Sequence, residues 1–296
     1  MSTIAHISDI HLAPLPKVKA RELFNKRITG YLNWQLKRNH QMCPDAAKKL
    51  ADHLAAQRAD INVVTGDLVN LSLPKEVEAA AKWLKRLGSS QRVCMVPGNH
   101  DAYLHSSLNL ARKAYGSYAS GETLDKSPYP FVRRVNEVAI IGCSSAIATP
   151  PFIAAGNFDK QQGERLAKCL QILGDAGLFR IVAIHHPPAK QFMRPFRKAL
   201  YGAKLFRDII AEHGAEMVLH GHTHKSSIHM IEGQDSKVPV IGVAAASTCP
   251  SSQESPARYN LFHIEKLHTG WSCTMREFGY QRVGESIVQR LQLRIY

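Results

Sequence analysis

Side chains that can bind metals recur at one kind of place in this chain, directly after short apolar segments. The segments 3–8, 60–67, 92–101, 179–186 and 216–222 have the composition of buried β-strands. In open α/β sheets, ligands bind beyond the carboxyl ends of the strands, so we expect these polar residues to converge on one rim. The residues concerned are Asp9, His11, Asp67, Asn99, His100, Asp101, His185, His186, His220 and His222.

These residue types define the chemistry that the rim could perform. Taken singly, each fragment has an ordinary structural explanation, because a Gly-Asp or Gly-Asn pair is usually a turn. Together, carboxylate, imidazole and amide oxygen suit Mn, Fe or Zn, and the absence of thiolates argues against a structural zinc knot. A carboxylate that bridges two metal ions about 3.5–4 Å apart supports a site that converts bound water to hydroxide and holds phosphate oxygens. The pattern therefore predicts a metal site, and a bridging carboxylate among these residues would suit a hydrolytic pair of ions.

The elements that must position these residues alternate between strand and helix. Helical patterns cover 45–58, 75–87 and 160–173, and the end of the chain, about 237–296, is rich in strands. Alternation of this kind followed by a strand-rich end predicts an α/β fold. We expect one domain over residues 1–296.

Composition limits the class of protein and of partner. The chain has 296 residues, 45% of them hydrophobic, which suits one large domain with an ample core. It carries 38 Lys and Arg against 24 Asp and Glu, a formal net charge of +14, which favours anionic partners. No signal peptide or membrane span is evident. The six scattered cysteines predict reduced, mostly buried thiols, and hence a soluble, cytoplasmic protein.

The order of the motifs identifies a resemblance. The series D-x-H (9–11), G-D (66–67), G-N-H-D (98–101), H-x-P (185–187) and G-H-x-H (221–224), preceded by His220, resembles the calcineurin-like metallophosphoesterase superfamily. The resemblance implies a four-layer αββα sandwich of two mixed β-sheets flanked by helices, with a strand-rich C-terminal part. It also implies a dinuclear centre of two divalent or mixed-valence transition metal ions, Mn, Fe or Zn.

Site roles follow from the resemblance by position. The first metal would be held by Asp9, His11, Asp67 and His222. The second metal would be held by Asp67, Asn99, His185 and His220. His100 would protonate the leaving group, oriented by Asp101. The resemblance gives His224 no role as a metal ligand. His224 would either support the ligands from behind or lie on the surface after the turn.

A basic segment follows the first motif directly. Residues 17–38, within a helical insertion at about 15–42, hold seven Lys or Arg and one Glu. Phe24, Ile28, Tyr31 and Leu32 fall near one helical face, although Gly30 weakens a continuous helix. Such a segment either lies on an anionic membrane surface or packs its apolar stripe on the sandwich.

A second basic segment, 185–202, places further polar groups near the expected metals. His186 is expected to contact substrate as a neighbour of His185. Arg194 and Arg197 are expected to meet a phosphate.

Three functions compete on this basis. The first is a phosphodiesterase of a small phosphorylated or cyclic-nucleotide-type substrate, acting by attack of metal-bound hydroxide with His100 as general acid. The second is a pyrophosphatase or phosphodiesterase of a membrane-associated substrate such as UDP-2,3-diacylglucosamine, with peripheral contact to the inner face of a membrane. The third is a basic nucleic-acid-binding or scaffold protein with a vestigial metal site. The complete ligand set argues against a vestigial metal site, so nucleic acid is the less expected partner.

Overall fold

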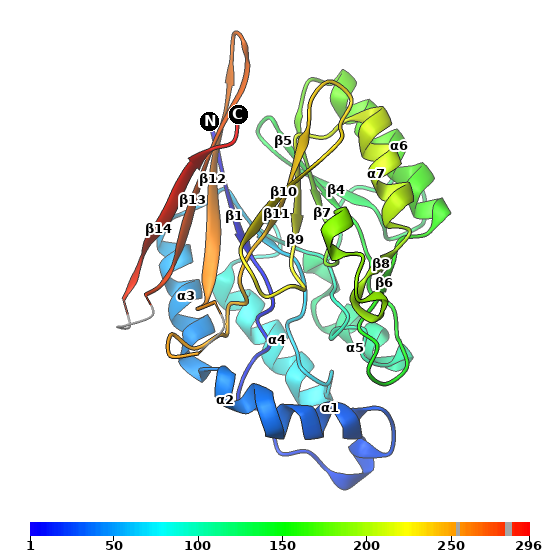
Figure 1. The fold of residues 1–296 in the computed structure, drawn as a ribbon, viewed down its shortest axis with the longest axis vertical. Coiled ribbons are helices and arrows are strands. Elements are labelled where there is room, and N and C mark those ends of the chain that lie inside the picture. Colours follow the sequence, from blue (N-terminus) through cyan, green and yellow to red (C-terminus); the bar gives the residue numbers. More distant parts are fainter. Residues whose placement is uncertain (253–254, 282–285) are drawn as a thin grey trace.

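Two large mixed β-sheets pack face to face, and helices cover their outer faces (Figure 1). The computed structural model of the protein describes residues 1–252, 255–281 and 286–296. Within these residues, the first sheet has the order β14–β13–β12–β1–β2–β3. Its strands are β1 (Ser2–Ile7), β2 (Ile61–Val64), β3 (Val93–Met95), β12 (Arg258–Leu267), β13 (Gly270–Tyr280) and β14 (Ile287–Arg294).

The second sheet has the order β10–β11–β9–β7–β5–β4. Its strands are β4 (Phe131–Val135), β5 (Val138–Gly142), β7 (Phe179–Ala183), β9 (Met217–His220), β10 (Ser227–Ile231) and β11 (Val238–Gly242). In the second sheet the central strands β11, β9, β7 and β5 are parallel, and β10 and β4 flank them in antiparallel pairs. In the first sheet β1, β2 and β3 are parallel with β3 at the edge, and β12, β13 and β14 continue from β1 in antiparallel pairs. A small separate pair joins β6 (Gly156–Asn157) to β8 (Leu200–Tyr201).

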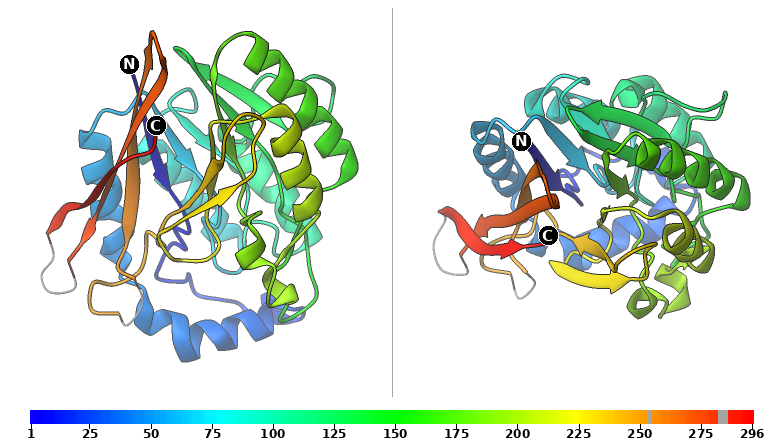
Figure 2. Two further views of the ribbon diagram at one scale, coloured as in Figure 1. Left: turned by 45° about the horizontal axis from the view of Figure 1, so that its top comes forward. Right: turned by 90° about the horizontal axis from the view of Figure 1, so that it is seen from above.

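The view from above in Figure 2 shows the stacked layers of helices and sheets. Three apolar cores lie between these layers. Alternate residues of one strand serve different cores: Ile4 packs between the sheets, whereas Ala5 and Ile7 pack under the helices of the first sheet. In the second sheet, Ile181 faces the first sheet and Val182 faces the outer helices. Because both faces of these strands are buried, their sequences read as continuous apolar runs.

Helices cover both outer faces. On the side of the first sheet are α3 (Pro44–Ala56), α4 (Pro74–Leu87) and α5 (His105–Tyr115), followed by the short η3 (Gly116–Tyr118). On the side of the second sheet are α6 (Lys160–Asp175) and α7 (Ala203–His213), with the short η4 (Lys190–Phe192) and η5 (Phe196–Lys198) before α7. The predicted four-layer αββα sandwich is confirmed.

The insertion, residues 15–42, runs along one edge of the molecule beneath both sheets (Figures 1 and 2). It contains η1 (Ala20–Leu23), α1 (Arg27–Asn33), a π-helical turn η2 (Trp34–Arg38) and α2 (Asn39–Gln41). Gly30 lies inside α1 and does not interrupt it. A Cβ at this position would collide with the side chains of Tyr103 and Leu71, so glycine allows the helix to approach the body of the protein closely.

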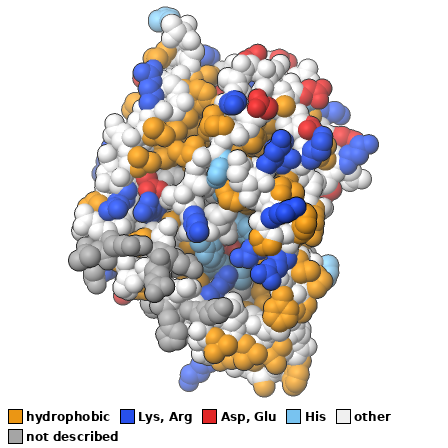
Figure 3. Space-filling view, in the orientation of Figure 1, with side chains coloured by type: hydrophobic (Ala, Val, Ile, Leu, Met, Phe, Trp, Pro, Cys, Tyr) orange, Lys and Arg blue, Asp and Glu red, His pale blue; other side chains and the backbone are white. Residues whose placement is uncertain are grey.

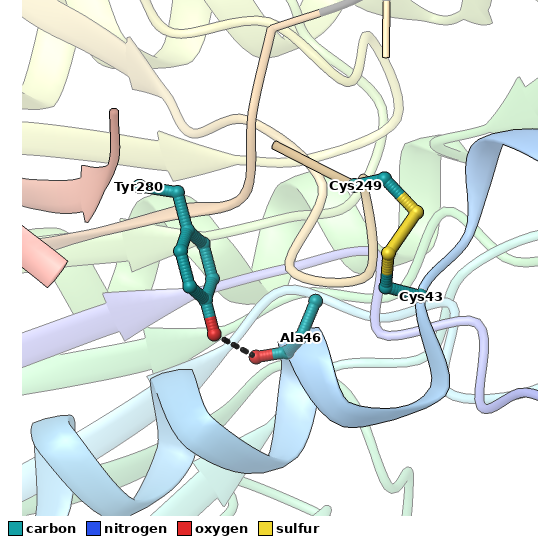
Figure 4. Close-up of a disulfide and its surroundings, with 4 residues drawn as sticks. All are labelled: Cys43, Ala46, Cys249 and Tyr280. Carbon is teal, nitrogen blue, oxygen red and sulfur yellow. Dashed lines mark hydrogen bonds between the residues drawn. A yellow bond between two sulfur atoms is a disulfide. The ribbon is translucent and has the colours of Figure 1, made fainter. Parts of the chain in front are cut away.

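A disulfide corrects the expectation that all cysteines are reduced. Cys43, at the end of the insertion, is bonded to Cys249 in the loop after β11, and the two positions are 206 residues apart (Figure 4). Cys94, Cys143 and Cys169 are buried free thiols, as is Cys273. Spacing along the chain does not show which cysteines meet in space. Disulfides are rare in the cytosol, so the premise of the cytoplasmic assignment fails, although the location itself stays a prediction.

Candidate metal centre

The predicted polar residues meet at the carboxyl ends of strands from both sheets. Loops after β1, β2 and β3 deliver the residues of the first sheet, and loops after β7 and β9 deliver those of the second. The residues from the first sheet are Asp9, His11, Asp67, Asn99 and His100. The residues from the second sheet are His185, His186, His222 and His224. The centre therefore lies at the seam between the sheets.

The backbone at five of these positions has an unusual conformation. Asp9, His11, Asp67, His222 and His224 have φ values of 52°, 39°, 56°, 68° and 57°. Positive φ is uncommon outside glycine, and such strain concentrates at functional sites where the surroundings enforce it. The motif glycine Gly221 permits the close approach of these turns, because a Cβ there would lie 2.6 Å from Asp9 Oδ2.

Asp67 lies at the middle of the group. Its Oδ2 is 3.3 Å from His185 Nε2 and 3.8 Å from His11 Nε2. Its Oδ1 accepts a hydrogen bond from the backbone N–H of His100 at 2.7 Å. Oδ2 thus lies between imidazoles that come from different sheets, a position suited to an oxygen shared by two cations, and Oδ1 is held by the backbone.

Asp9 defines one side of the centre. Its Oδ1 is 3.2 Å from His224 Nε2 and 3.8 Å from His11 Nε2, and it makes no hydrogen bond although it is buried. Its Oδ2 accepts a hydrogen bond from the backbone N–H of His222 at 2.9 Å. A buried carboxylate oxygen without a hydrogen bond is costly unless a cation completes it.

Asn99 defines the other side. Its Oδ1 lies 3.0 Å from His222 Nδ1 and 3.2 Å from His185 Nε2. An amide oxygen between two imidazole nitrogens completes a set of N and O donors typical of a transition-metal site.

Backbone carbonyls orient two of the imidazoles. His11 Nδ1 donates to the carbonyl of Val69 at 3.1 Å, and His185 Nδ1 donates to the carbonyl of Thr65 at 2.6 Å. Each bond leaves Nε2 directed at the carboxylates. Metal-binding histidines are usually held in this way by their second nitrogen.

The pKa values of the acidic and imidazole groups in the centre are shifted because these groups are buried close to one another. Burial favours the neutral form of Asp67, but the imidazoles of His185 and His100 outweigh it and hold the pKa of this carboxyl well below its usual range. Burial opposes protonation of His185, but the charge of Asp67 outweighs it and raises the pKa of the imidazole to about 9. Burial and the nearby charge of Asp67 raise the pKa of Asp101 to about 7. The centre thus holds several ionisable groups in one desolvated volume.

The donors fall into overlapping groups whose ligand atoms lie within 4.8 Å of one another. Among the described residues, these groups are Asp9–His11–His224, Asp9–Asp67–His185, His11–Asp67–His100 and His185–His186–His222. The carboxylates shared between groups, the oriented imidazoles and the unsatisfied Asp9 oxygen all fit metal ions.

His220 and His224 stand in different places from those expected. His220 ends β9, donates from Nδ1 to the carbonyl of Gly221 at 2.9 Å, and packs its ring against Phe192. It joins none of the donor groups found among the described residues. His224 instead lies 3.2 Å from both Asp9 Oδ1 and His11 Nε2. The turn after β9 rotates the chain, so alternation along an extended strand does not continue past His220. The second histidine of G-H-x-H was the available sequence signal for His224.

His100 lies beside the metal donors, but Asp101 does not contact its ring. His100 Nδ1 donates to the carbonyl of Asn70 at 2.5 Å, and the Arg38 guanidinium donates to His100 Nε2 at 3.1 Å. Burial and the charge of Arg38 lower the pKa of His100 to about 4. The expected orienting contact from Asp101 is therefore replaced by a backbone carbonyl. Arg38 was not singled out from the sequence, where it is one of several cations in the insertion.

Asp101 holds the loops that carry the ligands. Its carboxylate accepts hydrogen bonds from the backbone N–H groups of Asp67, Leu68 and Gly98 at 2.8, 3.1 and 2.9 Å. The loops after β2 and β3 are thus joined through one buried side chain.

The three expected substrate contacts differ in their surroundings. His186 is buried, donates from Nε2 to the carbonyl of Ala154, and has Ser145 Oγ 2.7 Å from Nδ1. Arg194 and Arg197 are exposed on the loop before β8, and Arg197 lines a cleft of about 420 Å³ that reaches Asn99 and His100. Arg194 is not among the lining residues of this cleft. An adjoining cleft of about 990 Å³ opens over Asp67, Asn99 and His222.

Solved structures share this architecture. A dimetal phosphatase from Danio rerio is 14% identical, with 97% of this chain and 98% of that chain covered and a TM-score of 0.67. The NAD nucleotidase of Haemophilus influenzae is 11% identical with a TM-score of 0.51, and the match covers 99% of this chain but 49% of that chain. The comparison with curated protein sequences gives no match. At these identities the structural likeness establishes the fold.

The family follows from the sequence model that matches most of the chain. Residues 2–226 match the calcineurin-like phosphoesterase family. The chain therefore belongs to this family of metal-dependent phosphoester hydrolases, as its motifs predicted. None of the helices in the described residues is long and apolar enough to cross a membrane.

Proposed function

We propose that this protein is a two-metal phosphodiesterase that hydrolyses a small phosphorylated substrate of the cyclic-nucleotide type. The observation that carries the proposal is the convergence of carboxylate, imidazole and amide donors from both sheets around Asp67. A centre of this composition, with a cleft of about 990 Å³ above it, suits a phosphate group and one organic substituent.

The distances support a revised set of ligands. One metal ion would be held by Asp9, His11, Asp67 and His224. The other would be held by Asp67, Asn99, His185 and His222. This set replaces His220 with His224, and it uses the residues whose strained backbone and mutual distances mark them as a group. Bound Mn, Fe or Zn ions would polarise phosphate oxygens and lower the pKa of a bound water.

Arg38 and His100 are proposed to handle the substrate. The Arg38 guanidinium borders the cleft and can hold a phosphate oxygen by a charge-assisted hydrogen bond. When phosphate takes this bond, His100 Nε2 is released from Arg38, and the added negative charge favours its protonation. His100 can then give a proton to a departing alkoxide while Nδ1 stays fixed on Asn70.

Turnover of paired chromogenic substrates tests the proposal. The protein loaded with Mn, Fe or Zn should hydrolyse bis(p-nitrophenyl) phosphate faster than p-nitrophenyl phosphate, and cyclic nucleotides should compete. Preference for the monoester would overturn the phosphodiesterase assignment. Salt-sensitive binding to DNA or RNA without any turnover would favour the nucleic-acid-binding alternative instead.

A further inference from the structure

The insertion turns apolar side chains toward solvent. Ile28, Leu32 and Leu36 follow one another at four-residue intervals and are 50%, 54% and 75% exposed, and Phe24 before the helix is 86% exposed. No residue of α1 is buried. A helix on a globular protein normally packs its apolar stripe inward. Three of the four predicted stripe residues, Phe24, Ile28 and Leu32, are thus at least half exposed, and Tyr31 is less so, which contradicts a stripe packed on the sandwich. Trp34 of η2, at 7% exposed, packs inward.

Two loops extend the same apolar surface. Phe152 is 81% exposed in the loop before β6, and Phe196 is 62% exposed in η5. The backbone N–H of Ala154 donates to the carbonyl of Arg197 at 2.8 Å, which joins these loops. Lys26 Nζ donates to the carbonyl of Thr149 at 2.7 Å, which joins the insertion to the first of them. We call the surface of residues 17–38, 150–153 and 194–198 the docking face.

The docking face surrounds the entrance to the metal centre. The cleft of about 420 Å³ has Lys26 and Gly30 of the insertion on one side, Phe152 and Arg197 of the loops on the other, and His100 within it. In Figure 3, apolar side chains gather at the lower end of the molecule over α1, with Lys and Arg side chains between them and the histidines above. A substrate that enters through this cleft passes the exposed apolar groups first.

The charge of the docking face is strongly positive. Residues 17–38 contain seven Lys or Arg and one Glu, and the loop segments 144–158 and 187–199 contain no acidic residue. The acid, Glu22, accepts a hydrogen bond from the backbone N–H of Lys19 at 2.7 Å. Lys17, Lys19 and Arg21 are exposed beside Phe24. Cations and exposed apolar groups thus share one surface.

Other cations of the insertion hold this surface in place. The Arg27 guanidinium donates to the carbonyls of Leu71 and Ser72 at 2.8 and 2.7 Å. Lys26 Nζ lies over the Tyr103 ring, 4.3 Å from its centroid. These anchored residues present the apolar stripe outward, so changes to the stripe itself need not disturb the fold.

We propose that the docking face binds the surface of an anionic lipid bilayer. Exposed Phe and Leu side chains flanked by Lys and Arg have the properties of surface-bound amphipathic segments, in which apolar groups enter the acyl boundary and cations meet acidic headgroups. A second copy of the chain fits poorly, because a symmetric dimer through this face would bring like charges together.

The substrate class follows from the position of the cleft. This step rests on the phosphodiesterase chemistry of the proposed function, and it replaces the cyclic-nucleotide type of substrate with a lipid-anchored one. With the docking face on a bilayer, the cleft that leads to His100 opens at the level of the headgroups. The substrate is then a phosphodiester that carries an alkyl or acyl chain anchored in the bilayer.

Vesicle flotation of the metal-free protein tests the docking separately from catalysis. The protein should float with vesicles of equal parts phosphatidylcholine and phosphatidylglycerol, and hardly at all with phosphatidylcholine alone. The double variant Leu32→Glu/Leu36→Glu should lower binding about tenfold or more, because it removes two apolar anchors and adds repulsion. Lys17→Glu/Lys19→Glu should weaken binding, and added salt should weaken it for the unmodified protein.

Matched variants on α6 provide the control. Ile172 is 55% exposed and Lys168 is exposed on the far side of the second sheet. Ile172→Glu and Lys168→Glu should leave vesicle binding unchanged, and circular dichroism should show all variants folded. Equal loss in both sets, or no flotation of the unmodified protein, would overturn the docking proposal. A dimer abolished by Leu32→Glu/Leu36→Glu would also overturn it in favour of self-association.

A pair of substrates with one leaving group tests the substrate class. Hexadecyl p-nitrophenyl phosphate in anionic vesicles and methyl p-nitrophenyl phosphate in solution both release p-nitrophenolate. The metal-loaded protein should prefer the hexadecyl ester, and Leu32→Glu/Leu36→Glu should remove this preference while methyl-ester turnover persists. The same ratio in both proteins would overturn the lipid-substrate inference. Vesicle binding without hydrolysis of either ester would refute the proposed function and leave the docking face intact.

Discussion

At the residue scale, the turns after the strands decide which side chains point into the candidate metal centre. An extended strand through residues 216–222 would place His220 and His222 on the same face. However, β9 ends at His220, and His222 and His224 take left-handed backbone. The side chain of His224, not that of His220, consequently reaches Asp9. Under the proposed assignment, the turn after β9 therefore brings His224, and not His220, to the first metal.

The two histidines should therefore differ in metal retention. His224→Ala should lose at least one metal ion per chain, because it removes a nitrogen beside Asp9 and His11. His220→Ala should retain both ions, since its ring packs against Phe192 and not against the donor groups. Elemental analysis of the purified variants measures this directly. Two full metals in His224→Ala together with loss in His220→Ala would restore the original assignment.

Variants of His100 and Arg38 should show different kinetic defects, because His100 is proposed to transfer a proton and Arg38 to bind phosphate. His100→Ala should keep both metals and lose about 10²–10⁴-fold in rate on diesters with alkoxide leaving groups, but much less on p-nitrophenyl esters. Arg38→Ala should act mainly on KM, by about 10–100-fold, since a hydrogen bond to a charged group is worth about 1.5–3 kcal/mol. Steady-state kinetics on both ester types measures the difference. Equal rate losses on good and poor leaving groups would show that His100 is not the acid.

Substitution of Asp101 should lower the stability of the fold more than it impairs proton transfer by His100. In Asp101→Asn, one acceptor oxygen becomes an NH₂ group that faces backbone N–H donors, so at least one of three hydrogen bonds is lost in a buried place. The free energy of unfolding should fall by about 1–3 kcal/mol. Urea denaturation of the metal-free protein checks this value. Unchanged stability, with the activity profile of His100→Ala, would instead support the orienting role.

At the element scale, the sequence supported the strands and the first helices well. Apolar runs at 3–8 and 179–186 correspond to β1 and β7, because strands buried on both faces need continuous apolar residues. The helical pattern at 160–173 corresponds to α6, and Asp159 caps it by accepting a hydrogen bond from the backbone N–H of Gln162 at 2.8 Å. Local chemistry of this kind is readable from sequence.

Long-range pairings were not readable in the same way. The bond between Cys43 and Cys249 and the contact between Arg38 and His100 depend on how distant segments fold together. The direction of the insertion's apolar stripe also depends on what lies beside it. Periodicity showed that the stripe exists but not which side faces solvent.

The insertion should loosen when its anchor is removed. Arg27→Ala loses hydrogen bonds to the carbonyls of Leu71 and Ser72, so amide hydrogen exchange over residues 20–41 should accelerate by about tenfold. Arg21→Ala, an exposed neighbour, is the control and should leave exchange unchanged. Hydrogen-exchange mass spectrometry measures both. Equal exchange in the two variants would show that Arg27 does not hold the insertion.

At the scale of the whole molecule, the centre joins two sheets that also meet through apolar packing and a few polar contacts, such as the bond from Arg133 Nη1 to the carbonyl of Val93 at 2.8 Å. Asp67 comes from the first sheet and His185 from the second, and they would share a metal under the proposed assignment. Binding to the native state alone stabilises by about 4 kcal/mol at a thousandfold excess over Kd. Metal removal should therefore lower Tm by several degrees.

Calorimetry before and after chelation and dialysis checks this expectation. Re-addition of Mn or Zn should restore Tm, whereas Asp67→Asn should stay at the lower value under both conditions. The same Tm for the loaded and stripped protein would contradict a metal that joins the sheets.

The disulfide would hold the protein together after proteolytic cleavage between its two cysteines. Cys43 and Cys249 are bonded although they lie 206 residues apart (Figure 4). The segment between them includes the loop with exposed Phe152. A protease that cleaves this loop leaves two fragments that are still covalently joined through the sulfur atoms. Asp9 and His11 would then remain attached to the fragment that carries His222 and His224. Such a nicked molecule would run as one band on a gel until a reducing agent separates it.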